Sequence, residues 1–350
     1  MRKGVGAALL AAALFGASTP IAKTLLGDIP PVMLAGLFYA GSGLGLSLVL
    51  AGRKWMSGSN GQAWVLPAAR DMKWLAGAIG FGGIAGPILL LLGLQSSAAS
   101  VSALLLNLES VFTALLAWIV FRENFDRRIA LGMAMIVMGG LALAWTPGEM
   151  RVSTGLLLVA AACFCWGVDN NLTRKLATND AMTIACIKGL VAGAVNIGIA
   201  FAMGAQWPSW TGISSAAVVG FAGYGVSLTL FVIALRELGT ARTGAYFSVA
   251  PFFGALLALA LQHEPVTLAL IAAALLMAAG VWLHVTEHHV HDHGHVVTTH
   301  VHPHSHDPHH QHPHGTEWDG AEPHTHQHDH QPLRHAHAHY PDIHHRHEHS

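Results

Sequence analysis

The sequence predicts an all-α integral membrane protein: ten transmembrane helices in two inverted five-helix repeats, followed by a disordered C-terminal tail. Composition gives the first indication, because 53% of the residues are hydrophobic and only 11% are charged, against roughly 25% charged residues in a soluble domain. Short motifs that recur within the apolar part give the second. The third is a sharp change near Glu287, after which 24 of the 26 histidines are found.

Ten stretches have about the 20 apolar residues that a helix needs to cross the hydrocarbon core of a bilayer. The first could instead be a cleaved signal peptide, since Arg2 and Lys3 precede it. Its A-A-A-L-F at 11–15 parallels A-A-A-C-F at 160–164 in the sixth stretch, which favours a retained span. The predicted spans are residues 4–24, 31–51, 74–94, 98–120, 128–146, 153–172, 182–203, 211–235, 240–262 and 265–285.

The apolar part contains an internal repeat. G-F-G-G at 80–83 returns as G-F-A-G at 220–223, and A-L-L-A at 114–117 returns at 255–258 in nearly the same register. We therefore expect a first repeat at 4–147, a second at 153–287 and a separate tail at 288–350. Five spans is an odd number, so the second repeat enters the membrane from the opposite side. Inverted repeats of this kind are typical of secondary transporters, whose site lies between the two copies.

Basic residues predict the orientation of the spans. With the N-terminus inside, thirteen Lys and Arg residues lie on the inner side, against only Lys23 and Arg151 on the outer side. Cytoplasmic loops carry such an excess. We expect a bacterial-type inner (plasma) membrane protein with both termini cytoplasmic. Its expected partners are the lipid bilayer, a small-molecule substrate and divalent metal ions; we expect no nucleic acid.

The layout resembles a known family. The most family-like segments are A-L-L-A-W-I-V-F-R-E, ending at Glu123, and S-V-A-P-F-F-G-A-L-L-A-L-A-L-Q-H-E, ending at Glu264. Over about residues 4–285 the chain resembles EamA-like members of the drug/metabolite transporter superfamily. The resemblance implies a ten-helix inner-membrane carrier, most often an exporter of amino acids or other small metabolites. The family usually has a proline where this chain has Ser110, whereas Pro251 keeps it in the ninth span.

Ionisable residues within spans are functional candidates, because a charge in the membrane is costly. Helical spacing aligns Ser102, Leu106, Glu109 and Thr113 along the fourth span. Glu109 would bind a cationic group or carry a proton as its accessibility alternates. The alternative is a structural carboxylate that pairs with Lys188.

Asp169 and Lys188 are the other two ionisable candidates. Asp169 would be a second binding or coupling carboxylate, or a solvated cap near the cytoplasmic end of the sixth span. Lys188 would pair with Glu109 or Asp169, bind a substrate carboxylate, or extend its amine toward the membrane surface.

The Gly-rich third and eighth spans form a corresponding pair of interrupted segments. Pro87 and Pro251 each remove a helical hydrogen bond, and such pairs indicate a transport path; close packing of small residues is the alternative. Tyr224 and Tyr246 are candidate cavity aromatics. Glu264 is expected to be a solvated or ion-paired residue at a span end.

The tail has too few large apolar residues to form a packed core. Its repeated H-x-H pattern favours Zn, Ni, Co or Cu, since imidazole is a good ligand for these ions. Three roles remain open: collecting metal for a carrier, regulating a carrier by metal or pH, and tolerated low-complexity sequence. The candidate ligands near the start of the tail are His288, His289, His291, His293, His295, His300, His302, His304, His306, His309 and His310.

The sequence therefore predicts a secondary transporter of the inner membrane, in which proton-coupled export of a small metabolite or amino acid accompanies metal binding by the cytoplasmic tail. One alternative is a Zn, Ni or Co efflux carrier with the tail as collector. A membrane-anchored metal or pH sensor without transport is another. An enzyme is not expected, because the chain lacks G-x-S-x-G, H-E-x-x-H and the phosphate-binding G-x-x-x-x-G-K-[ST], and transport itself needs no cofactor.

Overall fold

The computed structural model describes residues 2–57, 67–121, 127–144, 153–176, 180–238, 240–285, 289–294, 298–304, 324–330 and 334–339. The chain forms two compact units, Met1–Glu287 and His288–Ser350. The first unit is helical, and its helices coincide with the ten spans that the sequence predicts. Eight described helical segments are long and apolar enough to cross a membrane, and the apolar helices Ala250–Gln262 and Leu268–Leu283 are shorter. The all-α membrane fold is thus confirmed.

The helices of the first repeat are α1 (Arg2–Leu25), α2 (Pro31–Ser57), α3 (Met72–Ala78), the π-helix η3 (Ile79–Ala85), α4 (Gly86–Ser96), α5 (Ala99–Leu105), α6 (Leu108–Phe121) and α7 (Arg127–Ala144), with the short 3₁₀-helix η2 (Ala69–Asp71) before α3. The helices of the second repeat are α8 (Thr154–Arg174), α9 (Ala181–Ala202), α10 (Trp210–Gly220), the π-helix η4 (Phe221–Val226), α11 (Ser227–Leu238), α12 (Thr240–Phe247), α13 (Ala250–Gln262) and α14 (Leu268–Val285).

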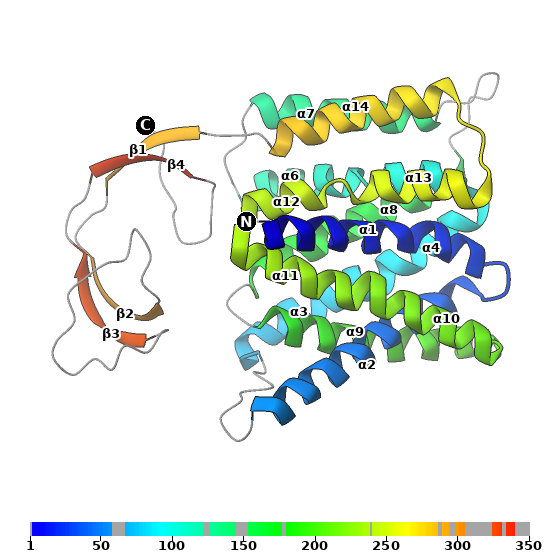
Figure 1. The fold of residues 1–350 in the computed structure, drawn as a ribbon, viewed down its shortest axis with the longest axis horizontal. Helices are drawn as coiled ribbons and strands as arrows, with labels where there is room; N and C mark the ends of the chain where they lie inside the picture. Colours follow the sequence, from blue (N-terminus) through cyan, green and yellow to red (C-terminus); the bar gives the residue numbers. More distant parts are fainter. Residues whose placement is uncertain are drawn as a thin grey trace. The chain divides into compact units, whose positions relative to one another are not determined.

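Equivalent helices of the two repeats pack as pairs. The pair α2–α9 and the pair α7–α14 lie at opposite edges of the helical body (Figure 1). Small residues allow the helices of each pair to approach closely, as membrane helices do. A Cβ atom on Gly189 of α9 would lie 2.7 Å from the backbone nitrogen of Gly43 in α2, and one on Gly139 of α7 would lie 2.8 Å from Met277 of α14.

In the interior, the first helix of each repeat packs against helices of the other repeat. Helix α1 packs against α11 and α13, whereas α8 packs against α4 and α6. The first helix of each repeat therefore contacts the third and fourth spans of the other repeat. This reciprocal packing is what a pseudo-two-fold arrangement of inverted repeats requires.

Within the described part of the membrane body, four spans are interrupted, at corresponding places in the two repeats. The third and eighth spans widen into π-helices at the matching Gly-rich segments. In each, a backbone N–H bonds to the carbonyl five residues earlier: Gly86 N–H to Phe81 O, and Ser227 N–H to Ala222 O. The fourth span breaks between α5 and α6, and the ninth between α12 and α13. Interruptions of this kind often occur at functional sites.

The two breaks arise from different residues. Pro251 is the second residue of α13 and has no N–H to donate. The break in the fourth span contains no proline; there Asn107 Nδ2 donates to the carbonyl of Leu104 (2.8 Å), and Ser110 Oγ donates to the carbonyl of Asn107 (2.7 Å). Side-chain bonds to nearby backbone compete with the helical pattern. A proline in the ninth span and side-chain hydrogen bonds in the fourth span thus produce breaks at corresponding places.

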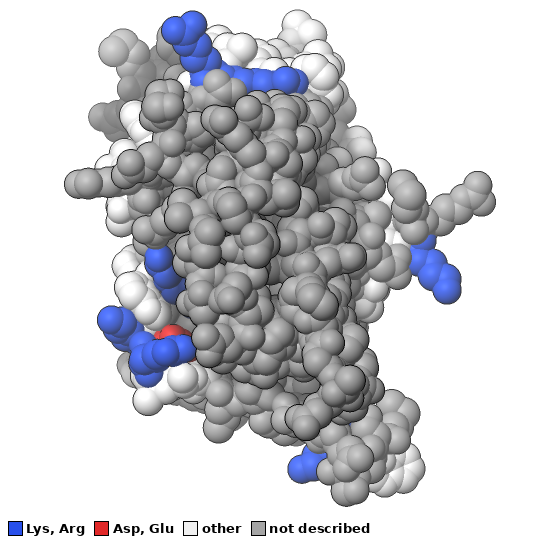
Figure 2. All heavy atoms as spheres, turned by 90° about the vertical axis from the view of Figure 1, so that its left-hand side faces the viewer, with Lys and Arg blue, Asp and Glu red and all other residues white. Residues whose placement is uncertain are grey.

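Basic side chains are exposed at the end of the body that carries the N-terminus. The left-hand face of Figure 1, which carries the N-terminus, is shown in Figure 2 with Lys and Arg at several separate points and one small acidic area. Arg53, Lys54, Arg70, Lys73 and Lys175 are all exposed near helix ends.

In the tail the structure describes four short segments, which pair as strands. β1 (His289–Gly294) pairs antiparallel with β4 (Arg334–His339), and β2 (Thr298–His304) with β3 (His324–His330). The H-x-H alternation has the two-residue period of a strand, which gives a physical reason for the pairing. Each sheet has only two strands.

Candidate functional site

The π-helix η3 forms one wall of the candidate site. Because Pro87 has no N–H, the carbonyls four and five residues earlier, on Gly83 and Gly82, lose their helical donors. Gly82 O instead accepts from Tyr39 Oη (2.6 Å) and Trp166 Nε1 (3.1 Å). Gly83 O accepts from Asn196 Nδ2 (3.0 Å). Side chains of α2, α8 and α9 thus donate hydrogen bonds to the carbonyls that the proline leaves without a helical donor.

Asp169 and Lys188 form an ion pair beside this π-helix. Asp169 is only 6% exposed and also accepts a hydrogen bond from Thr173 Oγ1 (3.0 Å). The solvated-cap alternative for Asp169 therefore does not fit its burial. Of the partners predicted for Lys188, the structure selects Asp169 rather than Glu109.

Residue 82 must be a glycine because the backbone of η3 approaches the side chain of Asp169 closely here. A Cβ atom there would overlap the carboxylate of Asp169. By contrast, a Cβ on Gly80 in the same π-helix would meet no atom within 4 Å. Of these two glycines, the site therefore needs Gly82 and does not need Gly80.

Glu109 lies in the first turn of α6, directly after the break in the fourth span. This is a favourable place for a carboxylate, because the N-terminus of a helix carries a partial positive charge. Its Oε1 accepts from Asn170 Nδ2 (2.8 Å), and the same amide donates to Thr113 Oγ1 (3.2 Å). Glu109 also interacts electrostatically with Asp169 and Lys188. The three predicted ionisable residues thus share one electrostatic environment.

The stripe predicted along the fourth span is divided by the break. Thr113 lies with Glu109, but Ser102 belongs to α5, is fully buried and bonds to Ser97 Oγ (2.7 Å). The prediction assumed a continuous helix, whereas the turn at Leu106–Asn107 separates the two halves. Ser102 therefore belongs to the junction between α4 and α5 rather than to the Glu109 cluster.

An aromatic series adjoins the ionisable cluster. Tyr224, in η4, lies 5.5 Å from Tyr39 and 5.8 Å from Phe15, measured between ring centroids. The series continues from Phe15 to Phe247 (5.6 Å). Tyr246 is half-buried on α12 and precedes Phe247. Tyr224 thus contacts a residue that holds η3, whereas Phe247, not Tyr246, continues the ring contacts.

At the other end of the fourth span, Glu264 caps a helix of the opposite repeat. Its two carboxylate oxygens accept from the backbone N–H groups of Ala99 (2.7 Å) and Ser100 (3.0 Å) at the start of α5. Lys23 Nζ donates to the carbonyl of Ser97 (3.0 Å) and interacts electrostatically with Glu264. Glu264 is thus a cap between repeats and more than a solvated boundary residue. Glu123, its counterpart in the sequence, lies outside the described residues.

Sequence reasoning missed Tyr39, Asn107 and Asn196. A signal for Asn196 existed: Pro87 frees carbonyls inside the membrane, and buried carbonyls need donors. Asn196 is an amide within an apolar span and fully buried. No comparable signal marked Tyr39, because tyrosine is common in membrane proteins.

The metal residues predicted in the tail fall into two groups. His289, His291 and His293 lie in β1, and His300, His302 and His304 in β2. The register places each opposite another histidine, for example His291 opposite His337 and His302 opposite His326. Among the residues whose side chains are described, no group of three His, Cys, Asp or Glu is arranged to hold a metal. His288, His295, His306, His309 and His310 lie outside the described residues.

Comparisons with known proteins agree with this architecture. An "Uncharacterized transporter" of Methanothermobacter thermautotrophicus is 30% identical over 214 residues, which cover 57% of this chain and 60% of the relative. A "Probable amino-acid metabolite efflux pump" of Salmonella typhimurium is 28% identical over 188 residues, covering 50% of this chain and 54% of the relative. Both matches thus cover less than two thirds of the relative's length.

A solved structure, described only as the crystal structure of a protein, has the same fold. It superposes with a TM-score of 0.59 at 18% identity and covers 80% of this chain and 95% of its own. The profile of the EamA-like transporter family matches residues 2–145 and 153–286, one match for each repeat. The chain therefore belongs to the EamA-like transporter family, a family of membrane transporters and not of enzymes.

Proposed function

We propose that the protein exports a small zwitterionic metabolite or amino acid across a bacterial-type inner membrane, in exchange for protons. The proposed orientation places both termini in the cytoplasm. The exposed basic residues at the N-terminal end of the body support it, since basic residues favour the cytoplasmic side. The printed name of the Salmonella relative, an amino-acid metabolite efflux pump, supports the substrate class and direction.

The observation that carries the proposal is the environment of Glu109. Asp169 and Lys188 are ion-paired with each other, whereas the hydrogen bond described for Glu109 comes from the neutral amide of Asn170. Glu109 is half-buried, and Asn170 is exposed. Glu109 is therefore the carboxylate of this cluster that is available to bind a substrate ammonium group or a proton.

Exchange follows from competition for this one carboxylate. An ammonium group and a proton both neutralise Glu109, so their binding is mutually exclusive. A proton arriving from outside would displace the ammonium group, and its later loss to the cytoplasm would prepare Glu109 for the next substrate. The breaks beside Glu109 and in the ninth span supply the points about which the repeats rock.

The test uses the full chain in proteoliposomes with a panel of labelled amino acids and an imposed pH gradient. We expect gradient-driven transport of at least one substrate by wild type and by Asp28→Asn, a control at an exposed loop carboxylate. Glu109→Gln should abolish gradient-driven transport. Equal transport by Glu109→Gln would exclude this carboxylate as the coupling site.

A second candidate, metal efflux with the tail as collector, is favoured by the histidine-to-histidine register of the tail strands. Zn, Ni, Co and Cu are the ions that imidazole would bind there. Cell-associated metal is measured in a metal-sensitive host that expresses the full chain, residues 1–287 or Glu109→Gln. A fall in one metal that Glu109→Gln abolishes would establish metal efflux. Unchanged metal in all three strains would leave the tail as a chelator or regulator.

A further inference from the structure

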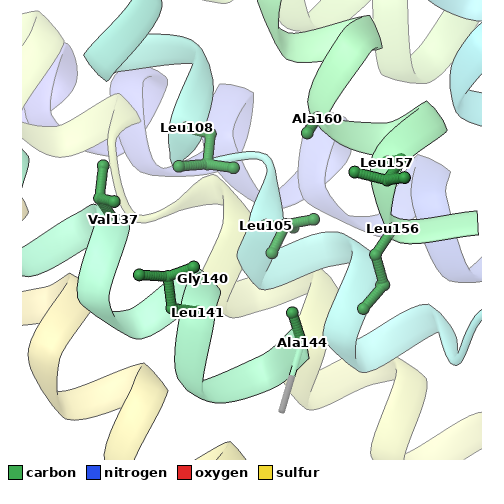
Figure 3. A pocket seen from close by; sticks show the side chains of 9 residues that line it. All are labelled: Leu105, Leu108, Val137, Gly140, Leu141, Ala144, Leu156, Leu157 and Ala160. Atoms are coloured by element: carbon green, nitrogen blue, oxygen red, sulfur yellow. The ribbon is translucent and has the colours of Figure 1, made fainter. Parts of the chain in front are cut away.

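An apolar groove opens on the flank of the helical body between α7 and α8, the last helix of the first repeat and the first helix of the second. Figure 3 shows its lining, which comes from three spans. Leu105 and Leu108 form the floor, and the other lining residues are Val137, Gly140, Leu141, Ala144, Leu156, Leu157 and Ala160. The groove has a volume of about 150 Å³, and none of its described lining residues has a charged or polar side chain.

The groove faces the bilayer. Its rim is exposed at Leu141 (63%) and Leu157 (56%), whereas Leu105 and Leu156 below them are buried. All of these residues lie within membrane-spanning helices, so the medium at the rim is hydrocarbon. A polar metabolite would find no hydrogen-bond partner here, and an unmet polar group in an apolar site is costly.

We propose that this groove binds one acyl chain of a membrane phospholipid, from the leaflet at which α7 ends and α8 begins. An apolar cavity of this size is large enough for a small hydrocarbon, since cavities of about 150 Å³ bind benzene. From Val137 to Ala144 the groove runs about 10 Å along α7, at 1.5 Å per residue, roughly a third of the hydrocarbon thickness. An acyl chain enters from the bilayer without leaving hydrocarbon.

The floor gives the site a particular position. Leu105 ends α5, and Leu108 begins α6, so the two residues lie on either side of the break in the fourth span. A chain in the groove contacts both halves of this span at once. The bound lipid would therefore lie directly against the joint that precedes Glu109.

Gly140 provides the variant that fills the groove. A Cβ atom there would lie 3.6 Å from Leu105 and 3.8 Å from Leu108, which are ordinary contact distances. A side chain at residue 140 therefore starts from an unstrained Cβ position beside the floor of the groove. Gly198 on α9 is a matched control, because it is exposed and its Cβ would meet no atom within 4 Å.

The test reconstitutes the full chain in vesicles of phosphatidylethanolamine and phosphatidylglycerol that contain a phospholipid with a diazirine on one acyl chain. After illumination, cross-links are mapped by peptide mass spectrometry. In wild type and Gly198→Phe we expect cross-links concentrated on the groove segments of α7 and α8. In Gly140→Phe they should fall about tenfold, because the side chain displaces about two methylene groups of lipid.

Gly140→Leu, a smaller change, is tested in parallel with thermal unfolding of every variant, so that a folding defect is recognised. A graded loss of cross-links in well-folded Gly140→Leu and Gly140→Phe supports the site. Cross-linking in wild type that is no stronger at the groove than around the exposed Val191 and Val195 of α9 would overturn the proposal. So would undiminished cross-linking in Gly140→Phe. Neither readout depends on transport.

Discussion

Gly82 is packed so closely against the ionisable cluster that no side chain fits at this residue. The residue lies against Asp169, and its carbonyl is held by Tyr39 and Trp166. One backbone unit therefore contacts the ion pair and two neighbouring spans. The lack of a side chain at this residue is what lets η3 approach α8 so closely.

Gly82→Ala should disrupt the site, whereas Gly80→Ala should not. The new methyl group would force Asp169 or η3 to shift, and overpacking of this kind costs about 1–3 kcal/mol. We expect a lower thermal unfolding temperature and about a 5- to 150-fold loss of transport in Gly82→Ala, from the same free-energy range. Proteoliposome transport and thermal unfolding are measured for both variants. Equal behaviour of the two would contradict the close approach.

The Asp169–Lys188 pair makes a second prediction at this scale. Lys188→Met leaves a buried carboxylate without its cation, which costs about 3–5 kcal/mol in well-buried pairs. Adding Asp169→Asn should recover much of that loss, because the uncompensated charge is removed. The double-mutant cycle is followed by thermal unfolding in detergent. If the two single losses simply add, the pair is not coupled in the folded protein.

At the residue scale, the sequence marks the ionisable residues of the spans, but it does not specify which of them pair with one another. Glu109, Asp169 and Lys188 stand out because charge is rare in apolar spans. Their pairing depends on how α6, α8 and α9 are rotated and offset, and a single sequence does not specify this. The sequence therefore leaves two possible carboxylate partners for Lys188, and the fold places Asp169 against it.

At the scale of elements, Pro87 and Asn196 act together. The proline removes a donor from the third span, and the amide of the seventh span replaces it on Gly83 O. Each is understandable only with the other: without Asn196, the carbonyl would be buried without a partner.

Asn196→Leu should therefore destabilise the protein by about 1–3 kcal/mol, the cost of a buried polar group without its partner. In the Pro87→Ala background the restored N–H can satisfy a nearby carbonyl, so the same substitution should cost clearly less. Thermal unfolding of the two single variants and the double variant measures the difference. An equal cost of Asn196→Leu in both backgrounds would show that the two residues act independently.

The cap formed by Glu264 makes the second prediction at this scale. Because Glu264 belongs to one repeat and α5 to the other, Glu264→Ala should loosen the end of the body at which they meet. In a background without the native cysteines, Ser102→Cys is fully buried in the capped state. Labelling by an impermeant maleimide from that side should accelerate several-fold once the charge-assisted cap is lost.

The matched control is Ser209→Ala, which removes the cap of α10 by a residue of its own repeat (Ser209 Oγ to Gly212 N, 3.1 Å). It should leave the labelling of Ser102→Cys unchanged. The same acceleration in both variants would mean that general helix fraying, and not a contact between repeats, controls access.

Elements were predicted well where a repeated pattern marked them and poorly where it did not. The matching Gly-rich segments at 80–83 and 220–223 indicated two interrupted spans, and both are π-helices. The break at Asn107 was missed because it contains no proline, and the stripe through Ser102 failed with it. Local bonds of Asn and Ser side chains decide that break, and composition does not reveal them.

At the scale of the whole molecule, the backbone is nearly symmetric and the chemistry is not. The interruptions match between the repeats, yet the offset that relates Ala114 to Ala255 places Ala250 opposite Glu109. Asp169 and Lys188 both lie in the second repeat and face η3 of the first. The η4 side instead presents the rings of Tyr224 and its neighbours. A symmetric frame thus encloses a site with a charged side and an aromatic side.

The last prediction concerns the independence of the tail. Because 1–287 and 288–350 form separate compact units, removing the tail should leave the buried contacts of the body intact. We expect the 1–287 variant to unfold at the same temperature as the full chain without metal. Binding of Zn or Ni should be lost with the tail, and so should any rise in unfolding temperature that metal produces, since a ligand stabilises only the fold that binds it. Equilibrium dialysis and thermal unfolding, each with and without metal, measure both effects. A metal-dependent rise that persists in 1–287 would place a metal site within the membrane body instead.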